Sequence, residues 1–119
     1  MTLYRGKDDA GSIVSSLDPG WGGPAGESVP AVRLSNTIQA PIDLLKLDVE
    51  GAEYGVIRDL VATGAIAHVR EAIIEFHQLD GEPDGVDQMV RTLQACGMQI
   101  RNEAHLSARI GLIHARRVH

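Results

Sequence analysis

Apolar blocks of strand and helix length follow one another along the last two thirds of the chain. Residues 42–48 form a nearly continuous apolar run that ends in acids, which is typical of a strand buried on both faces of an α/β sheet. Residues 52–62 carry apolar side chains at helical spacing, and Gly64 follows as a plausible helix end. Residues 69–76 are apolar again. The order therefore predicts strand, helix and strand, joined by a right-handed parallel crossover.

The pattern after this unit predicts one more helix and two closing strands. The helix is expected to begin with Asp84 as its N-cap and to end at Gly97. Residues 98–102 and 110–115 then have the composition of strands, and the polar segment 103–108 joins them. We expect these two strands to form an antiparallel pair with the end of the chain on the outside.

The first part of the chain has a weaker pattern. Residues 2–5 and 30–34 suggest short strands. Residues 6–28 between them are dominated by Gly, Ser, Asp and Pro, which predicts a long loop. A loop of this length is uncommon in a compact domain unless it covers a site or is disordered.

The composition fits one globular domain. The 119 residues are 44% hydrophobic, so we expect a single domain with short strands and a Gly/Ser-rich loop in residues 1–40 and an α/β core with a terminal hairpin in residues 41–119. The net charge of −5 argues against a nucleic-acid partner, which needs a basic surface. The apolar runs are too short for a signal peptide or a membrane span, so we expect no membrane partner and a cytoplasmic location.

Acidic residues gather where the first long apolar strand ends. Asp48 and Glu50 are two positions apart, so in an extended chain both side chains point to one face at the carboxyl end of the strand. Open α/β sheets bind their ligands at that end. Glu53 falls in the first turn of the next helix, where a negative charge suits the helix dipole. One of the three acids is therefore expected to be structural, and Glu50 could equally bond backbone amides of the turn.

The next strand also ends in functional side chains, Glu75 and His77, which period-two alternation sends to one face. If the crossover is parallel, the carboxylates of Asp48 and Glu50 and the ring of His77 converge within roughly 10 Å at a concave surface. His77 could act as a general base, because imidazole titrates near neutral pH. It could also be an exposed residue at a strand end.

A metal site is a further alternative. Asp48, Glu50, Glu75 and His77 would offer the oxygen-rich ligands that magnesium or another hard cation prefers. Acids at adjacent strand ends are common without a metal, so we expect none. Lys46, inside a strand expected to be buried, should pair with an acid such as Glu75, since an unpaired buried ammonium is costly.

These segments combine into a longer motif. Residues 42–53, IDLLKLDVEGAE, are followed by a helix that ends in glycine and by residues 74–77, IEFH. The motif resembles the FkbM-type family of S-adenosylmethionine-dependent methyltransferases, and residues 15–17, SSL, resemble the serine-rich loop upstream in that family. The resemblance implies the α/β fold of class I methyltransferases, a Rossmann-like doubly wound sheet that is mostly parallel and closes with an antiparallel strand pair.

The resemblance also implies a reaction and roles. The cofactor would be S-adenosylmethionine and the acceptor a small molecule, a sugar or natural product methylated on a hydroxyl. The expected catalytic residues are Asp48, which binds the cofactor's methionine part or orients the acceptor, Glu50, which supports the turn, and His77, which takes the hydroxyl proton. The residues expected to contact the acceptor are Ser15, Ser16 and Glu75.

One part of the family pattern has no counterpart. The family holds its cofactor with a glycine-rich turn after the first strand and an acid after the second, and neither can be placed before Ile42. The chain thus resembles only the C-terminal half of the domain, and we expect it to be inactive alone. The strand over residues 42–48 would then have an open edge, which a second copy of the chain or a complementing N-terminal half could fill. The alternative is a non-catalytic fragment or interaction module, and cofactor binding separates the two.

Overall fold

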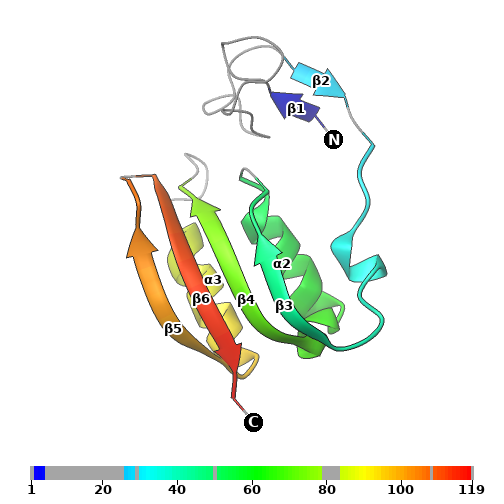
Figure 1. The fold of residues 1–119 in the computed structure, drawn as a ribbon. Coiled ribbons are helices and arrows are strands. Elements are labelled where there is room, and N and C mark those ends of the chain that lie inside the picture. Colours follow the sequence, from blue (N-terminus) through cyan, green and yellow to red (C-terminus); the bar gives the residue numbers. More distant parts are fainter. Residues whose placement is uncertain are drawn as a thin grey trace.

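The structure, a computed structural model, describes residues 2–4, 26–28, 30–49, 51–78, 84–107 and 109–118 (Figure 1). The elements in chain order are β1 (Thr2–Tyr4), β2 (Gly26–Ser28), the 3₁₀ helix η1 (Leu34–Asn36), β3 (Ile42–Leu47), α2 (Glu53–Ala62), the 3₁₀ helix η2 (Ala65–His68), β4 (Val69–His77), α3 (Gly85–Ala95), β5 (Met98–His105) and β6 (Ile110–Arg117).

Four strands form one mixed sheet in the order β3-β4-β6-β5. β3 and β4 are parallel and are connected by α2, so the expected crossover unit is confirmed. β5 and β6 are antiparallel, as expected for the closing pair. The expectation of a mostly parallel sheet is wrong for the described strands, because two of the three pairings are antiparallel. The closing hairpin accounts for both of them, since β6 also pairs antiparallel to β4.

The last strand lies inside the sheet, between β4 and β5, and not on the outside as expected (Figure 1). Gly111, Ile113 and Ala115 of β6 are buried, whereas most of β5 is exposed. The more apolar strand takes the central position because its side chains are then removed from water. Packing there is tight: a Cβ atom on Gly111 would lie 2.2 Å from Cζ of Phe76.

Helices α2 and α3 cover the same face of the sheet (Figure 1). Their buried apolar side chains pack with those of β4 and β6 into one core. The residues at the centre of this core are Ile57, Leu60, Ile74, Phe76, Leu93 and Ile113. Gly64 and Gly97 follow the helices with φ angles of 79° and 85°, so the helix ends expected at these glycines are confirmed.

β3 is an edge strand among the strands that the structure describes, so the expected open edge is present. The expectation that this strand is buried on both faces is wrong. Only Leu47 is buried along its length, and Leu44 is 51% exposed. The reason is that both helices lie on one face, which leaves the other face of β3 to solvent.

The N-terminal strands form a separate two-stranded antiparallel sheet. Thr2 pairs with Ser28, and Tyr4 pairs with Gly26. The expected first strand is therefore present, but its partner is the end of the segment expected to be a loop. The second short strand expected over residues 30–34 is wrong: residues 30–33 have no regular structure and Leu34 begins η1. Pro30 cannot donate a backbone hydrogen bond to a strand ladder.

Arg117 joins three segments at the start of β4. Its guanidinium donates hydrogen bonds to the backbone carbonyls of Ile66, Val69 and Cys96 at 2.6, 3.0 and 2.7 Å. These carbonyls belong to η2, the first residue of β4 and the C-cap of α3. The planar donor fork of arginine can satisfy several acceptors together, so one side chain from β6 fixes how these segments meet.

Glu71 on β4 lies beside His114 and Arg116 of β6. One carboxylate oxygen is 2.9 Å from Nε2 of His114 and the other is 3.6 Å from Nε of Arg116. The hydrogen bond from His114, together with the charge of Arg116, holds the pKa of Glu71 below its usual value of 4.5. The ionised carboxylate therefore contributes stability above that pH, and the contribution is lost as the pH falls through the lowered pKa.

Glu71→Gln should make the free energy of unfolding less sensitive to acid, because the variant has no carboxylate to protonate at this position. Urea denaturation between about pH 5 and about pH 3 would show a steeper decline for the wild type than for the variant. Glu103→Gln, at an acid on β5 whose carboxylate is 3.6 Å from the exposed His105, is the control. Parallel declines for the wild type and Glu71→Gln would contradict this prediction.

Candidate functional site

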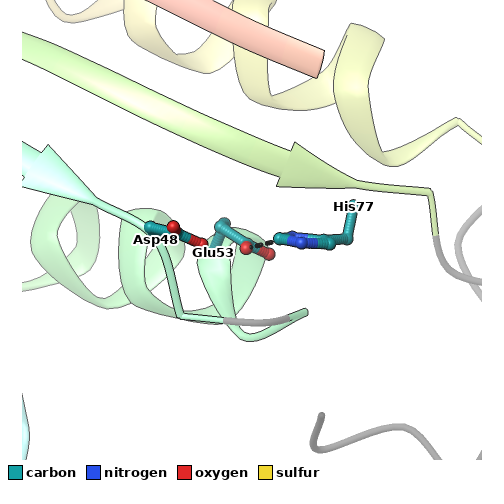
Figure 2. A group of neighbouring side chains, drawn as sticks. All are labelled: Asp48, Glu53 and His77. Carbon is teal, nitrogen blue, oxygen red and sulfur yellow. Dashed lines mark hydrogen bonds and ion pairs between the residues drawn. The ribbon is translucent and has the colours of Figure 1, made fainter. Parts of the chain in front are cut away.

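Three side chains converge where β3 and β4 end: Asp48, Glu53 and His77 (Figure 2). Asp48 directly follows β3, Glu53 is the first residue of α2, and His77 is the last residue of β4. One polar atom from each lies within 4.8 Å of the others. The structure thus brings Asp48 and His77 together, as expected. Glu50, the third expected member, lies outside the described residues.

The turn between β3 and α2 explains how Glu53 reaches this position. Gly51 has a φ angle of 106°, a conformation that residues with a side chain rarely adopt. The backbone N–H of Gly51 donates to both carboxylate oxygens of Glu53, at 3.2 and 3.1 Å. The carboxylate therefore turns back over the first turn of its own helix, where the N–H groups lack intrahelical partners and the dipole favours negative charge.

Glu53 and His77 form a buried pair. Nδ1 of His77 lies 2.6 Å from Oε1 of Glu53, and the two side chains are 4% and 0% exposed. Tyr54, the next residue of α2, donates its hydroxyl to the backbone carbonyl of His77 at 2.7 Å. Two adjacent residues of one helix therefore hold both the ring and the backbone of His77.

Asp48 is the member of the cluster that solvent reaches. Its side chain is 33% exposed, and Oδ2 lies 4.0 Å from Nζ of Lys46. Lys46 is 61% exposed, so the expectation of a buried lysine is wrong. Period-two alternation sends its side chain to the face of β3 opposite the buried Leu47. The ion pair between Lys46 and Asp48 is exposed, so it contributes little to the stability of the fold. A ligand that approaches from water would therefore meet Asp48 before the buried pair.

Sequence reasoning assigned Glu53 to the helix dipole and missed its contact with His77. The available signal was an acid two residues after a glycine at a strand-to-helix turn, the spacing that lets the carboxylate reach back to the glycine N–H. Glu75 is half-buried and is not one of the three converging side chains. Ser15 and Ser16 lie outside the described residues.

The donor set of two carboxylates and one imidazole could hold a divalent cation. In the structure, however, the buried donors are bonded to each other and to the backbone. Glu53 accepts from Gly51 and lies within hydrogen-bond distance of His77, so both buried groups have partners within the chain. The arrangement therefore matches an acid–histidine pair with a second, exposed acid beside it.

A surface hollow of about 480 Å³ adjoins the same turn. Gly51 and Ala52 line it together with the next turn of α2 and with residues 32–34 before and within η1. None of the three converging side chains lines it. A ligand in the hollow would contact the backbone of the turn without touching His77.

Comparison with known proteins gives one finding on family. The family model described as the methyltransferase FkbM domain matches residues 9–100. The match includes β3, α2 and β4, and therefore all three converging side chains. No curated protein and no solved structure matches the chain significantly. Among the described residues, the helices are too short or too polar to cross a membrane.

Proposed function

We propose that this chain, which belongs to the FkbM methyltransferase domain family, takes part in S-adenosylmethionine-dependent methylation of a hydroxyl in a sugar or natural product. The observation that carries the proposal is the convergence of Asp48 and His77 where the parallel strands β3 and β4 end. Ligands of open α/β sheets bind at the carboxyl ends of the strands, so a solvent-accessible acid and a histidine at that edge are placed to act on a bound molecule.

The sheet supports the finer proposal that the chain is the second half of a class I methyltransferase domain. A parallel crossover followed by an antiparallel closing pair agrees with the later part of a doubly wound sheet. The open edge of β3 is where further strands would continue that sheet. The strands could come from a complementing N-terminal half or from a second copy of the chain.

The residues of the site suit one end of the cofactor. The carboxylate of Asp48 could accept charge-assisted hydrogen bonds from the ammonium group of the methionine part. Among the described residues, no glycine-rich turn leads from an apolar strand into a helix, the feature that would let the backbone come close to the adenosine part of the cofactor. The adenosine end therefore needs residues beyond those that surround Asp48.

In the proposed reaction, the residues of the chain handle the acceptor and its proton. When bound, S-adenosylmethionine supplies a methyl group whose bond to the sulfonium sulfur breaks as the acceptor oxygen forms the new carbon–oxygen bond. The hydroxyl must lose its proton, and His77 receives it at a ring nitrogen as the general base. Asp48 orients the hydroxyl or the methionine part, and the products are a methyl ether and S-adenosylhomocysteine.

Calorimetry with S-adenosylmethionine tests this proposal. We expect weak binding by residues 1–119 alone and tight binding by a protein extended with any in-frame coding sequence upstream of Met1. In the extended protein, Asp48→Asn should raise Kd roughly 10- to 100-fold, because it removes a charge-assisted hydrogen bond.

Asp43→Asn is the matched control for Asp48→Asn, since Asp43 lies on the same strand with its side chain 96% exposed and 3.7 Å from Arg70. Equal affinities for the Asp48 variant and the wild type would remove Asp48 from the cofactor site. Absence of binding by both the chain and its extended form would favour a non-catalytic interaction module.

A further inference from the structure

We infer that Glu53 is a positioning residue for His77: it holds the ring with Nδ1 protonated, so that Nε2 is the nitrogen that receives the acceptor's proton. The inference deepens the proposed function, and its catalytic consequence rests on His77 being the general base. The arrangement itself, a carboxylate that fixes the tautomer of a histidine, can be tested without any reaction.

The hydrogen-bond partners of Glu53 define which ring nitrogen carries the hydrogen. Both carboxylate oxygens accept from the Gly51 N–H, at 3.2 and 3.1 Å, which is the role of an ionised carboxylate. Nδ1 of His77 lies 2.6 Å from one of these oxygens. An ionised carboxylate can only accept, so Nδ1 must donate. A neutral imidazole carries one hydrogen, which leaves the lone pair on Nε2.

The surroundings of the pair favour a fixed ring. The carboxylate of Glu53 is fully buried, and its negative charge lies at the N-terminus of α2, where the helix dipole stabilises it. The hydroxyl of Tyr54 holds the backbone carbonyl of His77 at 2.7 Å. Asp48, the other charged member of the cluster, remains in contact with water. Glu53 is therefore a buried ionic partner of the ring, placed by the same helix that holds the backbone of His77.

If Glu53 only stabilised the packing of α2 against β4, either tautomer of the His77 ring would serve. If Glu53 orients a general base, the ring must carry its hydrogen on Nδ1, as in the acid–histidine pairs of hydrolytic triads. The two roles therefore differ in a property of the His77 ring that can be measured directly. A cation site at the same three residues would differ again, because a metal would replace the hydrogen between His77 and Glu53.

Nuclear magnetic resonance of the ¹⁵N-labelled chain provides the test. Two-bond proton–nitrogen correlations identify which ring nitrogen of His77 is protonated, and the measurement needs neither cofactor nor acceptor. We expect the Nδ1–H tautomer in the wild type. In Glu53→Gln, the side-chain amide can keep its oxygen on the Gly51 N–H and turn its NH₂ to the ring, so the ratio of the two tautomers should shift at least roughly tenfold toward Nε2–H.

Tyr54→Phe is the matched control, because it removes the neighbouring hydrogen bond to the His77 backbone but leaves the carboxylate in place. Its tautomer should stay that of the wild type. A wild-type ring in the Nε2–H form, or a ratio unaffected by Glu53→Gln, would overturn the inference. The third measurement is a titration with Zn²⁺. If metal binding removes the hydrogen on Nδ1 of His77, the cluster is a cation site, and the inference that Glu53 positions His77 is overturned.

A kinetic measurement then connects the tautomer to the reaction. In a protein active in methyl transfer, Glu53→Gln should lower kcat while KM for S-adenosylmethionine changes little, because Glu53 acts through His77. A shifted tautomer in a chain that binds no cofactor would support the positioning arrangement and reject the proposed function. A normal kcat despite a shifted tautomer would reject the catalytic consequence.

Discussion

Replacing His77 with Gln is expected to lower kcat for methyl transfer by about 10²- to 10⁴-fold, the usual contribution of a general base. Glutamine can still donate a hydrogen bond to Glu53, so much of the buried contact is kept while the group that accepts the proton is lost. The assay follows transfer of labelled methyl groups from S-adenosylmethionine to a panel of simple glycosides. It uses the chain together with any in-frame upstream sequence.

His114→Gln is the matched control for this experiment. His114 also lies on a central strand and also bonds a glutamate, with Nε2 2.9 Å from Glu71, but it is not one of the three converging side chains. Its replacement should leave kcat unchanged. A His77 variant that retains the wild-type kcat would show that another group takes the proton, and a loss of similar size in both variants would indicate a general effect on the sheet.

Glu53→Ala is expected to lower the free energy of unfolding by about 1–3 kcal/mol, the usual cost of leaving a buried hydrogen-bond donor without its acceptor. The variant would leave the ring of His77 and the N–H of Gly51 without their carboxylate acceptor. Urea denaturation followed by circular dichroism measures the change.

Asp87→Ala provides the comparison, because Asp87 is also an acid in the first turn of a helix but is exposed. Its loss removes only a dipole interaction, worth about 0.3–1 kcal/mol. If both substitutions lower the free energy of unfolding by the same amount, Glu53 would stabilise the protein only through the helix dipole. Its contact with His77 would then add nothing to stability.

Much of the α/β core could be predicted from the sequence, because its elements have strong local signals. The apolar run before Asp48 and the helical spacing after Gly51 gave the strand and helix that the structure has. Glycines at the ends of both helices adopt positive φ angles as expected. The convergence of Asp48 and His77 followed from the parallel crossover alone, since a crossover brings two carboxyl ends to one edge.

The remaining features depend on contacts between distant residues. Strand burial was overestimated for β3 because an apolar run does not reveal how many faces of a sheet are covered. The role of Glu53 was missed because period-two alternation applies to extended chain, and the turn at Gly51 ends the extended geometry. The order of β5 and β6 depends on which strand buries more apolar surface against β4, a comparison that local patterns do not make.

The position of β6 between β4 and β5 has a consequence for how the chain folds as it is made. Residues 98–105 leave the ribosome before residues 110–117, yet β6 is the only partner of β5 among the described strands. Until β6 has been synthesised, the edges of β4 and β5 that will pair with it therefore remain unpaired. Closure of the sheet must follow synthesis of β6, and in the interval the nascent chain exposes edges that can pair with other chains.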